Sequence, residues 1–300
     1  MNPNDIPSDN PDVQVVVVTG GGQGVGRAIV ERLIADGKAV VVIELHEATI
    51  DWMRPLIDAR RAIAVLGDAG DDEVATRAAA AAAELGTCTG WVNNAAVFRD
   101  AFLHEAGGAA VAELIAANLR PCLAGSAAAI RAFRATSSAS GTGTTNYGPS
   151  VGGAPGSGPS GPAGGSALGS IVNVSSHQAQ RAVSGALPYA TAKGAIEALT
   201  RALAVDYGPW GIRVNAVALG SIVTPRMASH LAESPEPDRA AFARTMRELH
   251  PLGRPGNAAE AADAVAYLLS DRASFISGAV IPVDGGRAAQ GPDPEARLPE

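Results

Sequence analysis

Short runs of β-branched residues alternate along this chain with longer segments whose apolar residues recur at helical spacing. The first run, 13–18, is almost continuously apolar, which is typical of a strand covered on both faces of a sheet. A glycine-rich turn follows, and apolar residues then recur at helical spacing from Val25 to Leu33. Gly37 stands where a helix C-cap is expected, before a second apolar run at 39–43. These segments predict one βαβ unit.

The same alternation continues to the end of the chain. It predicts an α/β protein with a Rossmann-type, doubly wound parallel sheet of seven strands and right-handed crossovers. The further predicted strands are 62–66, 91–92, 171–174, 213–217 and 279–283, and the further predicted helices are 71–85, 109–133, 188–207 and 257–269.

One segment interrupts this alternation. Residues 137–169 contain 11 glycines, 4 prolines and no Asp, Glu, Lys or Arg, so they offer almost nothing to offset the entropy of ordering. We interpret them as a disordered, Gly/Ser/Pro-rich insertion in a single domain, 13–287, with flexible tails at 1–12 and 288–300. Because the insertion joins a helix end to a strand start, we expect it at the sheet edge opposite the ligand, which binds at the carboxyl ends of strands.

Composition and charge exclude several classes of partner. The formal net charge is −7 and the basic residues form no run, so no nucleic-acid footprint is present. No apolar stretch approaches the roughly 20 residues of a membrane span, and residues 1–12 are polar, which favours a cytoplasmic protein without membrane contact. Cys88 and Cys122 are the only cysteines and the five histidines show no ligand spacing, so neither a disulfide framework nor a metal site is expected.

The turn after the first strand carries the first candidate chemistry. Its sequence, from Thr19 to Gly26, is rich in glycine and lies between a predicted strand and a predicted helix. Backbone N–H groups and the positive end of the helix dipole can hold a pyrophosphate there. The candidate cofactor-binding residues of this turn are Gly20, Gln23, Gly24, Val25 and Gly26.

Glu44 ends the second predicted strand, 18 residues beyond Gly26. A carboxylate there accepts hydrogen bonds from a ribose diol. It would repel a 2′-phosphate about 4 Å away by a few kcal/mol per charge at an effective dielectric constant near 20. Lys38 and His46 lie near enough in the sequence to weaken that repulsion. We therefore expect NAD, with NADP as the less favoured cofactor.

Tyr189 and Lys193 form a second candidate site at the start of a predicted helix. At a spacing of four residues, both side chains share one helix face. Proton transfer by a phenol at neutral pH needs its pKa lowered by roughly 3, or about 4 kcal/mol. One ammonium at about 4 Å supplies that much at an effective dielectric constant near 20. Just upstream, a predicted strand ends in Ser175 and Ser176, whose hydroxyls would point toward a ligand.

Together these motifs resemble the single-domain branch of the short-chain dehydrogenase/reductase family. The resemblance runs from about Gln14 to Arg287, apart from the insertion. The matching motifs, in family order, are TGxxxGxG at 19–26, Asp68 after the third strand, NNA at 93–95, Asn118 in the fourth helix, the Ser-Tyr-Lys set and VDGG at 283–286. The chain departs from the family at Ala96, where NNAG has glycine, and at Leu219, where PGxxxT has proline.

The resemblance implies roles for the candidate catalytic residues. The family's serine lies 13 residues before the tyrosine, which selects Ser176 to hydrogen-bond the substrate oxygen. Tyr189 would give or take the proton. Lys193 would lower the phenol pKa and hold the nicotinamide ribose, and Asn118 would anchor a water that links Lys193 to solvent.

The resemblance also implies cofactor contacts. Asp68 would contact the adenine amino group, and Asn94 with Ala95 would pack beside the adenosine ribose. The Ile222 backbone and the Thr224 side chain would bind the carboxamide. Ala69, Ala96, Tyr189 and Lys193 complete the candidate cofactor site. Residues 221–251 match the family's mobile substrate cover.

The resemblance implies an NAD-dependent oxidoreductase that interconverts a small-molecule secondary alcohol and its ketone. It also implies a homotetramer, with the helices of Asn118 and Tyr189 at one interface. Enoyl reductases of similar fold commonly space their Tyr and Lys more widely, so C=O chemistry is favoured over C=C reduction. Two alternatives stay open. One is a 3-oxoacyl thioester reductase that uses NADPH, and the other is a non-catalytic NAD-binding module that senses redox state.

Overall fold

The predicted seven-stranded sheet is present in the computed structural model, which describes residues 13–139 and 168–291. All neighbouring strands are parallel, in the order β3-β2-β1-β4-β5-β6-β9, so the strand order reverses between β1 and β4. The strands are β1 (Gln14–Thr19), β2 (Ala39–Glu44), β3 (Ala62–Leu66), β4 (Thr87–Asn93), β5 (Gly169–Ser176), β6 (Ile212–Leu219) and β9 (Val280–Val283).

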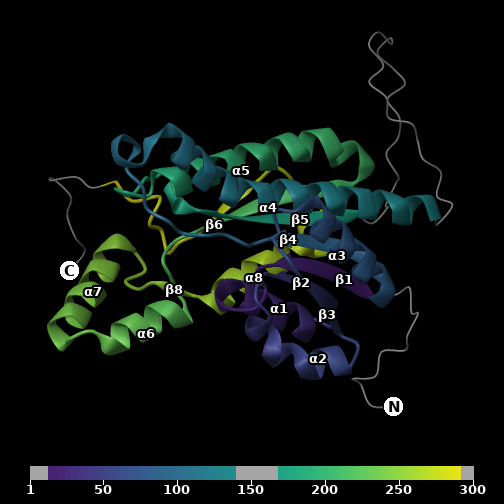
Figure 1. Ribbon diagram of the computed structural model, residues 1–300, viewed down its shortest axis with the longest axis horizontal. Coiled ribbons are helices and arrows are strands. Elements are labelled where there is room, and N and C mark those ends of the chain that lie inside the picture. The colour runs from purple at the N-terminus through teal and green to yellow at the C-terminus, as the bar shows by residue number, and fades with distance from the viewer. Residues whose placement is uncertain (1–12, 140–167, 292–300) are drawn as a thin grey trace, which may run out of the picture.

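Helices cover both faces of this sheet, which explains the unbroken apolar runs of its strands (Figure 1). In β1, Val15 and Val17 pack into a buried cluster under α3 and α4, whereas Val16 and Val18 pack into a second cluster under α1 and α8. The helices of the first face are α3 (Asp72–Leu85), α4 (Leu103–Ala139) and α5 (Leu187–Tyr207), and those of the second are α1 (Gly24–Ala35), α2 (Arg54–Asp58) and α8 (Ala258–Leu269).

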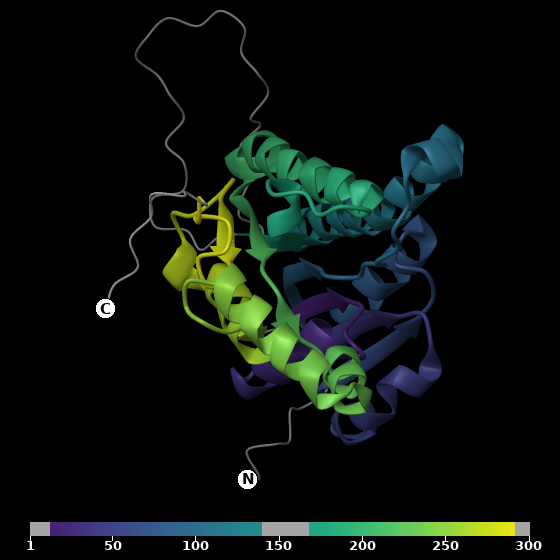
Figure 2. The same cartoon turned by 90° about the vertical axis from the view of Figure 1, so that its left-hand side faces the viewer.

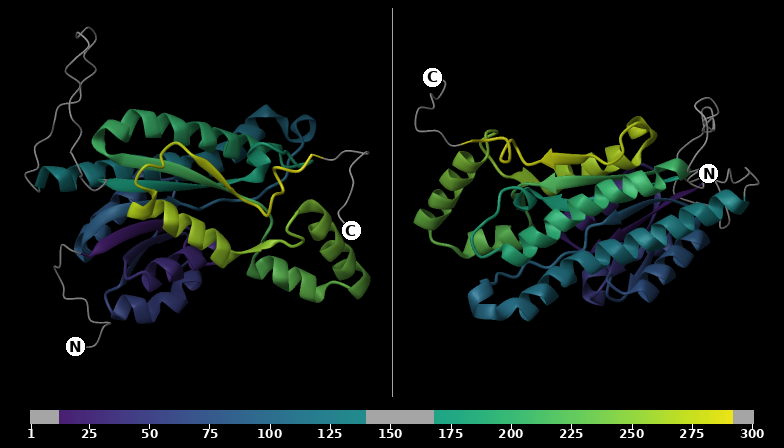
Figure 3. Two further views of the ribbon diagram at one scale, coloured as in Figure 1. Left: turned by 180° about the vertical axis from the view of Figure 1, so that it is seen from behind. Right: turned by 90° about the horizontal axis from the view of Figure 1, so that it is seen from above.

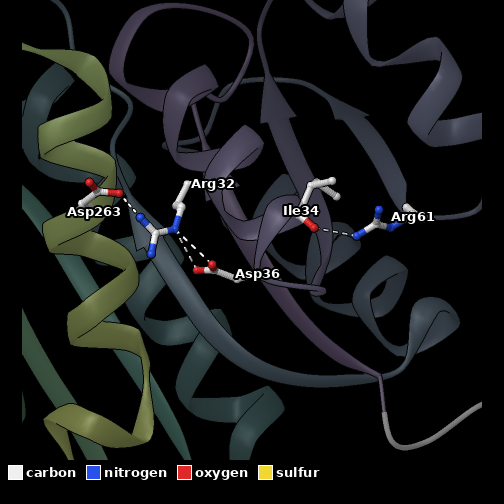
Figure 4. Close-up of polar contacts among 5 residues, drawn as sticks. All are labelled: Arg32, Ile34, Asp36, Arg61 and Asp263. Carbon is white, nitrogen blue, oxygen red and sulfur yellow. Dashed lines mark hydrogen bonds and ion pairs between the residues drawn. The ribbon is translucent and has the colours of Figure 1, made fainter. Parts of the chain in front are cut away.

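Polar contacts join the carboxyl end of α1 to neighbouring elements (Figure 4). Arg32 forms ion pairs with Asp36 on its own helix and with Asp263 on α8. Arg61 Nη2 donates a hydrogen bond to the carbonyl of Ile34 at 2.7 Å, near the carboxyl end of α1. Exposed ion pairs of this kind contribute about 0–1 kcal/mol each, so the buried apolar cluster between α1, α8 and the sheet holds this layer together.

The predicted elements differ from the observed ones mainly around α4. This helix begins at Leu103 rather than at 109, has a kink at Gly107, and continues to Ala139, so residues 137–139 of the predicted insertion are helical. Residue 169 opens β5. The rest of the predicted insertion, 140–167, lies outside the described residues, as do 1–12 and 292–300. The described ends of the insertion lie at the amino end of β5, at the edge of the sheet opposite its carboxyl ends.

Two further helices, α6 (Pro225–Glu233) and α7 (Glu236–Leu249), lie within the segment assigned to the substrate cover. Sequence periodicity did not predict them. They project from the end of the molecule that faces the viewer in Figure 2, and both views of Figure 3 place them beyond the sheet. The short parallel pair β7 (Ile222–Val223) and β8 (Gly256–Asn257) closes their base. Within 13–139 and 168–291, no helix is both long and apolar enough to cross a membrane.

Candidate active site

A cavity of about 380 Å³ opens at the carboxyl ends of the strands, around the point where the strand order reverses. Open α/β sheets bind their ligands at this position. The candidate cofactor residues that line it are Gly20, Gln23, Val25, Gly26, Glu44, Asp68, Ala69, Asn94, Ala95 and Ala96. Leu45, His46, Val97 and Ala117 also line it and were not candidate cofactor residues; they come from the segments after β2 and β4 and from α4, which only the folded chain brings together. The other candidate cofactor residues lie outside its lining: Gly24, Tyr189, Lys193, Ile222 and Thr224.

The glycine turn has no room for larger residues at its two ends. Gly20 has a φ of +65°, in the left-handed region that favours glycine. A Cβ on Gly26 would lie 1.9 Å from the carbonyl oxygen of Gly20. Asn94 Nδ2 donates to the carbonyls of Thr19 and Gly20, both at 3.0 Å, and Thr19 Oγ1 accepts from the backbone N–H of Ala95 at 2.9 Å. These bonds fix the turn against the end of β4.

The amino end of α1 is available to an anionic ligand. Gln23, at the N-cap position, makes no side-chain hydrogen bond to the first turn, so no side-chain cap satisfies the helix's first N–H groups. A Cβ on Gly24 would lie 3.9 Å from Thr224 Cγ2, so the turn faces the base of α6. A cavity bordered by an uncapped helix end and a glycine-rich turn fits the pyrophosphate of a dinucleotide.

Glu44 presents a fixed carboxylate to the cavity. Its Oε2 accepts from the backbone N–H of Gly22 at 2.9 Å, and its Oε1 accepts from that of Leu45 at 3.0 Å. Lys38 lies at the opposite end of β1 and donates to the side chain of Gln14. Of Lys38 and His46, only His46 therefore lies at the cavity.

Ser176, Tyr189 and Lys193 lie together where β5 meets the first turns of α5. Lys193 Nζ lies 5.3 Å from the centroid of the Tyr189 ring and donates to the carbonyl of Val174 at 2.6 Å. A hydrogen bond joins the side chains of Tyr189 and Ser176. Ser176 Oγ also accepts from the backbone N–H of Gln178 at 3.2 Å, which fixes the hydroxyl at the end of the strand.

Burial dominates the titration of this pair. It raises the pKa of Tyr189 by more than the hydrogen bond with Ser176 lowers it. Burial also lowers the pKa of Lys193 to about 8. The net direction for Tyr189 is opposite to that expected from a nearby ammonium, because both groups are withdrawn from water and Lys193 is directed to a backbone carbonyl. At neutral pH Tyr189 is therefore a protonated phenol.

Ser175 and Asn118 lie near this site, and their side chains form hydrogen bonds with Glu197, Val97 and Leu114. Ser175 Oγ donates to Glu197 Oε1 at 3.1 Å, so the two adjacent serines point to different surroundings. Asn118 Oδ1 accepts from the backbone N–H of Val97 at 3.0 Å, and its Nδ2 donates to the carbonyl of Leu114 at 3.2 Å. The bond to Val97 ties the loop after β4 to α4, and the bond to Leu114 lies within α4.

Phe98 and His177, which are not among the candidate site residues, lie beside Tyr189 and Ser176. The ring of Phe98 meets the Tyr189 ring edge-on, with 5.0 Å between centroids. His177 is buried, and its Nδ1 lies 3.3 Å from Ser176 Oγ. Burial, with a smaller effect of the Arg287 charge, lowers the pKa of His177 to about 4, so it is neutral at pH 7.

The base of α6 and α7 is tied to the strand ends beside this site. Thr224 caps α6, because its Oγ1 accepts from the backbone N–H of Met227 at 3.3 Å. Buried His250, after α7, accepts from the backbone N–H of Ser221 through Nε2 at 3.4 Å, and its Nδ1 lies 2.8 Å from the Met246 carbonyl. In the part of the chain that the structure describes, no three His, Cys, Asp or Glu side chains form a group that could hold a metal ion.

Comparison with known proteins identifies the class that this fold and site belong to. A family model described as short chain dehydrogenase matches residues 14–142, and one described as Enoyl-(Acyl carrier protein) reductase matches residues 160–288. The chain is 36% identical to cis-4-hydroxycyclohexanecarboxylate dehydrogenase of Sinomonas cyclohexanicum, over 92% of this chain and 97% of that protein. It is 30% identical to levodione reductase of Leifsonia aquatica, over 92% and 94%.

The solved structures agree. A crystal structure of levodione reductase superposes with a TM-score of 0.74 and 29% identity, covering 92% of this chain and 98% of that one. The protein therefore belongs to the short-chain dehydrogenase/reductase family and is an oxidoreductase.

Proposed function

We propose that the protein is an NAD-dependent dehydrogenase or reductase that interconverts a secondary alcohol and a ketone. The observation that carries the proposal is the meeting of Ser176, Tyr189 and Lys193 beside a cavity that fits a dinucleotide. The names of two relatives agree with this chemistry, since one is a dehydrogenase of a hydroxy compound and the other is a reductase of a dione.

Each residue of the site has a part in the proposed reaction. When bound, NAD would supply a hydride acceptor for the alcohol carbon, and NADH a hydride donor for the ketone. Ser176 Oγ, held by the Gln178 amide, hydrogen-bonds the substrate oxygen. Tyr189 donates its proton to that oxygen in reduction and takes it back in oxidation. Lys193 positions the phenol, and Asn118 holds the loop at Val97 and anchors the water of the proton path.

NAD is the proposed cofactor because Glu44 holds its charge at the cavity wall through two backbone amides. A ribose diol can donate hydrogen bonds to this carboxylate, whereas a 2′-phosphate would be repelled by it. Within the glycine turn, 19–26, no residue carries a positive charge that would offset the repulsion. Asp68 and Asn94 complete the adenosine side of the proposed site.

Carbonyl reduction is proposed although the second half of the chain matches a model described as an enoyl reductase. Tyr189 and Lys193 are four residues apart on one face of α5, and the nearby Ser176 can bind the oxygen of a C=O group. A substrate panel should therefore contain an enoyl thioester and a 3-oxoacyl thioester beside simple secondary alcohols and ketones.

We also infer a cytoplasmic homotetramer in which α4 and α5, side by side on one face, form one interface (Figure 3). Their outer surface carries Leu123 and Val205, exposed by 47% and 76%, and exposed alanines such as Ala198 and Ala202 that allow close approach of helices. Light scattering on the protein as it elutes from a size-exclusion column gives the mass of the assembly. A monomer would refute this inference and leave the proposed chemistry intact.

Tyr189→Phe tests the mechanism, because it removes the proton donor and little volume. We expect turnover, followed by NADH absorbance, to fall at least a thousandfold while NADH still binds, as followed by its fluorescence. Tyr207→Phe, at the other end of α5 against Trp210, is the matched control and should leave both unchanged. Normal turnover in the Tyr189 variant would refute the mechanism.

A further inference from the structure

The turn after β9 holds Arg287 beside the site. Asp284 organises this turn, because its Oδ1 and Oδ2 accept from the backbone N–H groups of Gly286 and Ala288 at 2.9 and 2.7 Å. The turn is pressed against the end of β6, since a Cβ on Gly220 would lie 2.7 Å from the Asp284 Cα. Arg287 Nη1 donates to Ser221 Oγ, which fixes the guanidinium next to the segment that leads into β7.

Arg287 also lies close to the residues that flank the reacting groups. Its charge is near enough to His177 to lower the pKa of that imidazole, and His177 Nδ1 lies 3.3 Å from Ser176 Oγ. A second cation stands farther out. Arg181, which follows η2 (His177–Ala179), donates through Nη2 to the carbonyl of Ala288 at 3.2 Å. Two guanidinium groups therefore border the same side of the site.

The charge of Arg287 has no ion-pair partner among the residues at 13–139 and 168–291, and neither has that of Arg181. Asp284 attracts Arg287, yet both of its carboxylate oxygens are held by the backbone. Arg287 is half-buried, and the one hydrogen bond of its guanidinium to these residues goes to a neutral hydroxyl. A guanidinium has five N–H donors in a planar fork, so donors remain for a ligand.

We propose that Arg287 forms an anion subsite beside Ser176, and that the substrate is a secondary alcohol or ketone that also carries a carboxylate or a comparable oxyanion. This inference rests on the proposed function, because it places the substrate oxygen at Ser176. A guanidinium binds a carboxylate through two parallel hydrogen bonds, and partial burial strengthens them. Ser221 and the turn around Asp284 hold the fork in place before the ligand arrives. The more exposed Arg181 adds long-range attraction for the anionic ligand without contacting it directly.

Matched substrate pairs test the subsite, each pair being a hydroxy acid and its neutral amide. Suitable pairs are 3-hydroxybutyrate with 3-hydroxybutyramide, and 4-hydroxycyclohexanecarboxylate with its carboxamide. In Arg287→Met we expect kcat/KM for the acids to fall at least tenfold, mainly through KM, while the amides stay within about threefold. Arg287→Lys keeps the charge and should recover part of the loss. Arg54→Met, an exposed change on α2 with the same loss of charge, is the control and should alter neither.

Direct binding provides a second measurement that does not require turnover. Cyclohexanecarboxylate, which has no hydroxyl to oxidise, should compete with substrate in the wild type, and its inhibition constant should rise at least tenfold in Arg287→Met. Equal losses for acids and amides, or turnover of neutral alcohols without any preference for the acids, would overturn the subsite and leave the proposed function standing. If no alcohol or ketone of either kind is turned over, the proposed function fails, and the subsite fails with it.

Discussion

Replacing Glu44 with glutamine removes one negative charge from the cavity wall and keeps the size of the side chain. In the wild-type protein the Glu44 carboxylate accepts hydrogen bonds from the backbone amides of Gly22 and Leu45, at 2.9 and 3.0 Å, so it is held in one place. A glutamine has a single acceptor oxygen and can keep only one of these bonds. The substitution should therefore affect the charge strongly and the shape of the turn slightly.

The size of the effect follows from Coulomb's law. Two unit charges about 4 Å apart at an effective dielectric constant near 20 repel by about 4 kcal/mol. Because Glu44 is partly exposed, solvent screening reduces this to about 2–4 kcal/mol, which corresponds to roughly a 30- to 1000-fold preference against a 2′-phosphate. The glutamine also loses charge-assisted hydrogen bonds to the ribose diol, which costs about 1–2 kcal/mol of NAD binding.

The assay compares kcat/KM for NAD and NADP with one substrate at fixed pH and ionic strength. We expect the NAD/NADP ratio to fall at least a hundredfold in Glu44→Gln, through a gain with NADP and a smaller loss with NAD. Glu31→Gln, an exposed change on α1 with the same loss of charge, is the control and should leave the ratio unchanged. A wild-type preference for NADP, or an unaltered ratio in the variant, would refute the electrostatic argument.

Two further predictions concern the turn and the pH dependence of stability. In Gly26→Ala the new Cβ would lie 1.9 Å from the Gly20 carbonyl oxygen, so we expect urea titrations to show about 1–3 kcal/mol of destabilisation and NADH binding to be lost. Gly108→Ala, where nothing lies within 4 Å of the new Cβ, is the control and should show neither effect. Wild-type NADH binding by the Gly26 variant would contradict the close packing of the turn. The pKa of His177 is about 4 in the folded protein and about 6.5 in the unfolded chain, so the unfolded chain binds more protons between these values and stability falls as the pH drops through that window. Between pH 7 and pH 4.5, His177→Gln should lose about 1–2 kcal/mol less of its free energy of unfolding than the wild type, after allowance for screening. Denaturant titrations at the two pH values measure this loss, and an equal loss in both proteins would exclude the effect.

Most of the fold could be predicted because the strands are apolar on both faces. Alternate residues of β1 and β2 enter different buried clusters, so their sequence contains continuous valine runs. The helices α6 and α7 could not be predicted in this way. α7 is rich in charged residues and has no buried residue, so it lacks a buried apolar face, and α6 has only nine residues, which is too short for its periodicity to stand out.

The candidate site shows the same division. The glycine turn and Glu44 could be found from the chain, because the strand–turn–helix order places them at one edge of the sheet. The folded structure, by contrast, shows that the Ser175 hydroxyl faces Glu197 and the Ser176 hydroxyl faces Tyr189. The sign of the Tyr189 pKa shift also depends on burial, which no spacing between residues reports.

The sequence by itself therefore determined the order of the sheet strands and of the helices that cover them, the family motifs and the candidate reacting groups, because these depend on local residue pattern. Only the tertiary structure decided the environment of each group. It buries Tyr189 and Lys193 together, separates Lys38 from the cavity, and brings Arg287 against Ser221 and near His177. Desolvation and charge proximity arise between residues that are far apart in the chain, so they appear only once the chain has folded.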